Sequence, residues 1–149
     1  MNDWFIGTPS GFGRIVLGLD YYQWQDDIFF KAARPKSQNM AICAVNGSGK
    51  TSRLALTLML WWASTFPKSK TITTAGVFRQ VKNLWQDVNK FRHKFPGAKF
   101  NDTDFKLPNG STAQGFSTDN PEYFEGHHAD YLLIIVDEAK SVADGIMRQ

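Results

Sequence analysis

The chain of 149 residues contains one cysteine, Cys43, and no long hydrophobic run. A single cysteine excludes a disulfide within the chain and suits a reducing compartment. The longest apolar stretch, Leu54 to Phe66, is interrupted by Thr57 and two further hydroxyl residues, and it is shorter than the roughly 20 residues that span a bilayer. The first residues carry Asp3 and Arg14 and lack the apolar core of a secretory signal. We therefore expect no membrane partner.

The net charge of the chain excludes fewer classes of function than the lack of a second cysteine and of a long apolar run do. Seventeen Lys and Arg residues against fourteen Asp and Glu residues give a net charge of +3 and a pI near 9.0. This balance is compatible with a nucleic-acid partner but does not establish one, because many soluble domains are equally basic. The length suits one domain with a real hydrophobic core.

A short glycine-containing loop organises the sequence. An apolar, strand-like run from Met40 to Val45 leads into it, and a long apolar helix pattern from Lys50 to Phe66 leads out. Residues 44–51 read Ala-Val-Asn-Gly-Ser-Gly-Lys-Thr, which matches a phosphate-binding P-loop except that Ala44 replaces the first glycine. The alternative is a glycine-rich turn between a core strand and a core helix.

The chemistry of a P-loop assigns a role to each part of this segment. Glycines let successive backbone N–H groups turn toward one anion, and the start of the following helix adds further donors and a partial positive charge. Lys50 would reach the β- and γ-phosphates of ATP, and the Thr51 hydroxyl would bind Mg²⁺. The expected ATP-binding residues are Asn46, Gly47, Ser48, Gly49, Lys50, Thr51 and Ser52.

A second apolar run, from Tyr131 to Val136, ends in two carboxylates. In an open α/β sheet, ligands bind at the carboxyl ends of the strands, so this strand end and the P-loop should meet in one crevice. Asp137 would bind Mg²⁺ opposite Thr51, and Glu138 would orient the attacking water, which makes Glu138 and Lys50 the catalytic candidates. The alternative is a strand that ends in two solvated acids.

Aromatic residues are dense just upstream of the loop, in a segment that predicts a short helix from about Tyr21 to Phe30. A ring could stack on adenine while a glutamine amide pairs with its edge. Tyr22, Gln23 and Gln25 are the candidates for this role. The alternative is that these side chains are core residues, and the residue types leave both interpretations open.

The remaining pattern predicts a short strand at Lys70–Thr74, an amphipathic helix from Val77 to about Phe95, and a hairpin around Pro108-Asn109-Gly110. The polar face of the helix carries several Lys and Arg residues; it is interpreted as solvated, with a DNA-phosphate contact as the minority option. The neighbouring His127 and His128 are interpreted as loop residues, because no further ligands at metal-site spacing accompany them.

These segments, taken together, resemble phage terminase large subunits. The resemblance covers about residues 21–139, and its motifs are Tyr-Gln-Trp-Gln at 22–25, the P-loop, Arg-Gln-Val at 79–81, Glu-Gly-His-His at 125–128 and Val-Asp-Glu-Ala at 136–139. The P-loop and the Asp-Glu pair are shared by many ATPases. The Trp-Gln element, the Arg-Gln-Val helix and the Glu-Gly-His stretch are more particular to terminases.

The resemblance implies the ATPase domain of a viral DNA-packaging motor that uses ATP and Mg²⁺ in the cytoplasm of an infected bacterial host. It also implies double-stranded DNA, a portal and a small terminase subunit as partners, and a homo-oligomeric ring. Several terminases have an Arg or Lys inside the P-loop, where this chain has Asn46. Arg79 or a neighbouring subunit is therefore the candidate source of an arginine finger.

The implied fold is α/β: a mainly parallel P-loop NTPase sheet flanked by helices on both faces, with a β-hairpin insertion. We expect an irregular arm at residues 1–20 and the ATPase domain at residues 21–149. The sequence stops eleven residues after Glu138, so the family's later sheet strands and its nuclease domain are expected to be missing. Two alternatives remain, namely a nucleotide-binding or assembly fragment without catalysis, and a helicase-like ATPase.

Overall fold

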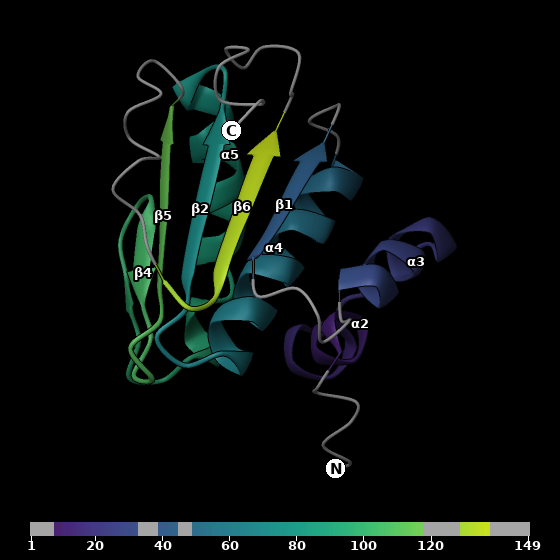
Figure 1. Ribbon diagram of the computed structural model, residues 1–149, viewed down its shortest axis with the longest axis horizontal. Coiled ribbons are helices and arrows are strands. Elements are labelled where there is room, and N and C mark those ends of the chain that lie inside the picture. Colours follow the sequence, from purple (N-terminus) through teal and green to yellow (C-terminus); the bar gives the residue numbers. More distant parts are fainter. Residues whose placement is uncertain (1–7, 33–38, 45–48, 118–128, 138–149) are drawn as a thin grey trace.

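The computed structural model describes residues 8–32, 39–44, 49–117 and 129–137; for residues 31–32, 39–44, 49–52 and 137 it describes the backbone. These residues form one six-stranded sheet with the strand order β1-β6-β2-β5-β4-β3 (Figure 1). Its strands are β1 (Asn39–Ala44), β2 (Lys70–Ala75), β3 (Lys99–Phe100), β4 (Asp104–Lys106), β5 (Thr112–Ser117) and β6 (Leu132–Asp137). Strands β1, β6, β2 and β5 are parallel, whereas β4 and β3 are antiparallel.

Two long helices, α4 (Gly49–Thr65) and α5 (Phe78–Asn89), lie on the same face of this sheet (Figure 1). The indole N–H of Trp85 on α5 donates to Thr73 Oγ1 on β2 at 2.9 Å. A central stretch of α4 is buried almost all round, as its apolar pattern predicts, because it packs between the sheet and the amino-terminal helices. We expected helices on both faces; within the described residues, both long helices cover one.

The amino-terminal segment differs from the irregular arm expected there. Residues Pro9–Phe12 form the short helix α2, and Gly13–Leu17 form a π-helical turn, η1. The Thr8 side chain accepts a hydrogen bond from the Gly11 N–H, which caps α2. Phe12 and Leu17 are buried against the core. Helix α3 (Gln23–Ala32) follows, close to the predicted position.

Helix α5 is shorter than its sequence pattern predicts. The apolar spacing continues through Phe91 to Phe95, but the α-helix ends at Asn89 and a 3₁₀ turn, η2 (Arg92–Lys94), takes over. The Asn89 amide donates both to the Trp85 carbonyl and to the Asn101 carbonyl, so it joins the end of the helix to the segment that follows β3. Phe91 and Phe95 still pack against the core.

The predicted hairpin is present, and its strands belong to the sheet. Strands β4 and β5 pair in antiparallel fashion, and β5 also pairs with β2 in parallel. The Gly110 N–H donates to the Leu107 carbonyl at 3.0 Å, and Gly110 has a φ of +87°, which closes the turn at a position that favours glycine.

Candidate functional site

The carboxyl ends of three strands lie together. In the register of the sheet, Asp137 at the end of β6 is opposite Ala44 at the end of β1 and Ala75 at the end of β2. Helix α4 begins at Gly49, shortly after β1 ends, so its positive end belongs to the same edge. Figure 1 shows the tips of β1 and β6 beside each other at this edge. The end of β1, the start of α4 and the acidic end of β6 therefore lie at one edge of the sheet, which is where nucleotides bind in open α/β sheets.

The structure describes these candidate residues to different extents. Lys50, Thr51 and Ser52 form part of the first turn of α4, and Asp137 is the last residue of β6. For these four, the description covers the backbone. The other candidates here, Asn46, Gly47, Ser48 and Glu138, lie outside the described residues, as do the two adjacent histidines at 127–128. The structure thus brings the two backbone segments to one edge of the sheet.

Arg79 lies in the first turn of α5 and is exposed. Since β2 ends at Ala75 and α5 begins at Phe78, Arg79 is near the same edge of the sheet. Val77 and Phe78 beside it are also exposed. The next side chain, Gln80, has a buried Oε1 with no hydrogen-bond partner among the described residues. The first turn of α5 thus presents an exposed arginine and an unsatisfied amide oxygen near the strand ends.

The candidate adenine residues divide into one buried and two exposed side chains. Gln25 is fully buried, and its Oε1 accepts a hydrogen bond from the Tyr22 N–H at 2.8 Å. This contact caps the start of α3. Tyr22 and Gln23 are exposed, and the Gln23 amide donates to Asp27 Oδ1 at 3.0 Å. The alternative, that these side chains are core residues, does not hold for Trp24, which is 45% exposed.

Tyr21 and Thr57 form a contact that sequence reasoning missed. The Tyr21 hydroxyl lies 2.7 Å from Thr57 Oγ1 on α4, in a partly buried position. Burial raises the pKa of Tyr21 to about 12, although the charge of Arg14 acts in the opposite direction. The sequence signal was a hydroxyl residue in the middle of an otherwise apolar helix, which periodicity alone cannot pair with a partner.

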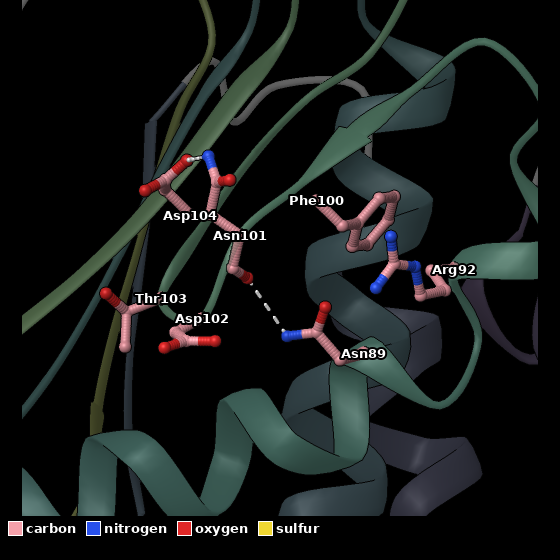
Figure 2. Close-up of a pocket in the computed structure, with 7 residues that line it drawn as sticks. All are labelled: Asn89, Arg92, Phe100, Asn101, Asp102, Thr103 and Asp104. Carbon is pink, nitrogen blue, oxygen red and sulfur yellow. Dashed lines mark hydrogen bonds between the residues drawn. The ribbon is translucent and has the colours of Figure 1, made fainter.

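No cluster of three or more residues able to hold a metal ion occurs in the part of the chain that the structure describes. None of the helices described is long and apolar enough to cross a bilayer. A pocket of about 410 Å³ lies on the β4–β3 side of the sheet, away from β1 (Figure 2). Part of its polar lining is already engaged, because Asn89 donates to the Asn101 carbonyl and Asn101 donates to Asp104.

Three comparisons place the chain among known proteins. No family model matches it. A protein of Enterobacteria phage P7 named "Probable terminase, large subunit" is 24% identical over 156 residues, an alignment that covers 95% of this chain and 30% of that protein. The chain thus spans under a third of the length of this relative.

Two solved structures share the fold. They are the large terminase ATPase domain of Thermus phage P74-26, with a TM-score of 0.69, and its R139A mutant, with a TM-score of 0.71. Both are 16% identical in sequence, and both alignments cover 95% of this chain and 62–63% of the solved chain. The chain therefore has the α/β fold of a phage large terminase ATPase domain, and along nearly its whole length it is similar in sequence to a phage terminase large subunit.

Proposed function

We propose that this chain binds and hydrolyses ATP as the motor domain of a phage terminase large subunit. The observation that carries the proposal is the shared edge of the sheet, where the first turn of α4 and the Asp137 end of β6 come together. A P-loop sequence precedes that helix, and a second carboxylate, Glu138, follows that strand. The similarity to a terminase large subunit supports the same function.

In this proposal, the loop amides and Lys50 hold the phosphates of ATP. Thr51 and Asp137 would hold Mg²⁺, because a hydroxyl and a carboxylate are oxygen ligands of the kind that this ion prefers. The bound ion would neutralise charge on the β- and γ-phosphates. Glu138 accepts the proton of the attacking water. Arg79, exposed at the start of α5, is the candidate arginine finger toward its own or a neighbouring site.

The wider role follows from the terminase similarity and is part of the proposal. The chain would act with double-stranded DNA, a portal and a small terminase subunit, within a homo-oligomeric ring in the cytoplasm of an infected bacterium. ATP hydrolysis would then power the movement of DNA into a capsid. In this proposal, the chain is the nucleotide-binding part of that machine.

The test compares two variants in two assays. Lys50→Ala should lose most ATP affinity in a binding titration, because the ammonium group pairs with the phosphates. Glu138→Gln should retain ATP affinity but lose phosphate release by two or more orders of magnitude, because the amide cannot accept a proton. Lys82→Ala, which removes an exposed lysine elsewhere on α5, is the matched control. Phosphate release by Glu138→Gln at the parent rate would refute the role of Glu138.

A second candidate is a nucleotide-binding or assembly fragment that does not turn over. The chain aligns with 30% of a terminase large subunit and 63% of a solved ATPase domain chain, so turnover by this chain itself is the property to measure. Steady-state phosphate release with and without DNA separates the two candidates. ATP binding without release under both conditions would support the fragment and exclude the motor function for this chain alone.

A further inference from the structure

Helix α4 holds the chain segment that precedes the candidate adenine residues. Tyr21 contacts Thr57 through their hydroxyl oxygens at 2.7 Å, and the Arg53 guanidinium donates to the Asp20 carbonyl at 3.1 Å. Arg53 and Thr57 are four residues apart and share one face of the helix. They lie about 6 and 12 Å along the axis from Gly49, where α4 begins. Residues 20 and 21 are thus fixed to the first turns of the helix that follows the P-loop.

The Tyr21–Thr57 contact has a defined direction. Thr57 Oγ1 donates its single hydrogen to the Arg53 carbonyl at 2.8 Å. Its oxygen is therefore left as the acceptor, and the Tyr21 hydroxyl is the donor. A phenylalanine at position 21 would remove the donor, and a valine at position 57 would remove the acceptor at almost the same shape.

Tyr21 is also fixed by its other neighbours. Its ring meets Phe29 edge-on, with centroids 4.8 Å apart, and the Arg14 guanidinium lies 5.3 Å from the ring centroid. Arg14 in turn pairs with Asp26 at 2.9 Å. A Cβ at Gly13 would lie 2.6 Å from Tyr21 Cζ and closer still to the hydroxyl oxygen. The position of Tyr21 therefore requires glycine at position 13.

The residue after Tyr21 starts the turn that carries the adenine candidates. The Tyr22 N–H donates to Gln25 Oε1, and Gln25 is fully buried. A continuous set of contacts thus joins Thr57 on α4 to the capped first turn of α3. Because Tyr21 and Tyr22 are adjacent, the position of Tyr21 sets where that turn lies relative to the start of α4.

We propose that Tyr21 and Thr57 are positioning residues that set the spacing between the turn that carries the adenine candidates and the start of α4, the helix that follows the P-loop sequence. This inference rests on the proposed function, because it assumes that one nucleotide spans both elements. ATP uses both elements, whereas inorganic triphosphate uses the loop alone. Loosening the Tyr21–Thr57 contact therefore weakens ATP binding and reduces the preference for adenine, and it leaves triphosphate binding unchanged.

The test measures binding of ATP, GTP and inorganic triphosphate to the full chain. Tyr21→Phe and Thr57→Val should each weaken ATP binding by about twofold to tenfold, the effect of losing one hydrogen bond. The ratio of ATP to GTP affinity should fall by the same factor, and triphosphate affinity should stay at the parent value. Gly13→Ala should give the same pattern, because it displaces Tyr21 without removing a polar group.

The matched control is Tyr131→Phe. This tyrosine stacks on Phe66 at the other end of α4, with ring centroids 4.5 Å apart, so its hydroxyl should not affect any of the three affinities. Equal weakening of ATP and triphosphate in Tyr21→Phe, or no weakening of either, would overturn the inference.

Binding measurements on the parent chain distinguish a failure of this inference from a failure of the proposed function. If the parent binds triphosphate but does not prefer ATP to GTP, the positioning role is wrong while the phosphate site stands. If the parent binds neither ATP nor triphosphate, the nucleotide site itself is wrong and the positioning role falls with it.

Discussion

A substitution at Gly115 on β5 would test how α5 packs against the sheet. A Cβ at this position would point directly at α5. It would lie 2.7 Å from Val81 Cγ1 and 2.8 Å from Trp85 Cδ1, and it would also press on the indole nitrogen. Ordinary contact begins at 3.4 Å. We therefore expect Gly115→Ala to destabilise the fold by overpacking.

The size of the effect follows from how firmly Trp85 is held. Its side chain is fully buried, and its N–H donates to Thr73 Oγ1 at 2.9 Å. Moving the ring costs packing, about 1–3 kcal/mol for an extra methyl in a filled core. Displacing the indole also strains or breaks its hydrogen bond, at about 1 kcal/mol. A loss of about 2–4 kcal/mol would be a large part of the 5–15 kcal/mol typical of a domain.

Urea unfolding followed by tryptophan fluorescence would measure this loss. Gly18→Ala is the matched control, because Gly18 has a φ of +71° but a Cβ added there would meet no atom within 4 Å. That control should lose about 1–2 kcal/mol through its backbone conformation alone. Adding Val81→Ala to Gly115→Ala should recover part of the stability. A Gly115→Ala chain as stable as the parent would refute this packing of α5.

Two further predictions concern stability. Burial raises the pKa of Tyr21 from 10.0 to about 12. The unfolded chain therefore ionises first, and the contribution of Tyr21, complete below pH 10, should be lost between pH 10 and pH 12. Denaturant unfolding across this range should show a smaller decline in Tyr21→Phe than in the parent. Separately, Ser111→Ala should cost about 1–3 kcal/mol in urea unfolding, because the buried Ser111 hydroxyl donates to the Phe66 carbonyl at 2.8 Å and accepts from Ser69; an unchanged midpoint would show that this network is dispensable.

Sequence patterns within short windows predicted the elements that form through interactions between residues close in the chain. The apolar runs at β1 and β6 form neighbouring parallel strands, as continuous apolar runs predict for a parallel sheet. The 3.6-residue period predicted α4 almost to its ends. The proline and glycine at 108–110 predicted the turn between β4 and β5. In each case, the residues that carry the signal are also the residues that form the element.

The features that the sequence did not predict involve contacts between residues that are far apart in the chain. Helix α5 ends at Asn89, where the side-chain amide donates to the Asn101 carbonyl, twelve residues later. The packing of Trp85 and Val81 of α5 over Gly115 of β5 joins two elements that lie apart in the sequence. The contact of Tyr21 with Thr57 crosses 36 residues. Periodicity within a window of ten to twenty residues carries no information about such pairs.

The two ends of α4 should respond differently to substitution, and this difference tests the whole arrangement. At its end, the Ser111 hydroxyl donates to the Phe66 carbonyl and accepts from the Ser69 hydroxyl, near the amino ends of the strands. At its start lie the P-loop helix turn and the contact with Tyr21. A parallel sheet separates these two regions by the length of its strands. Ser111→Ala should therefore lower the free energy of unfolding without changing the ratio of ATP to GTP affinity. Tyr21→Phe should change that ratio even when it is measured well below the unfolding transition. If both variants changed the ratio in proportion to their loss of stability, the base preference would report general loosening of the fold, and the spacing set by α4 would have no separate role.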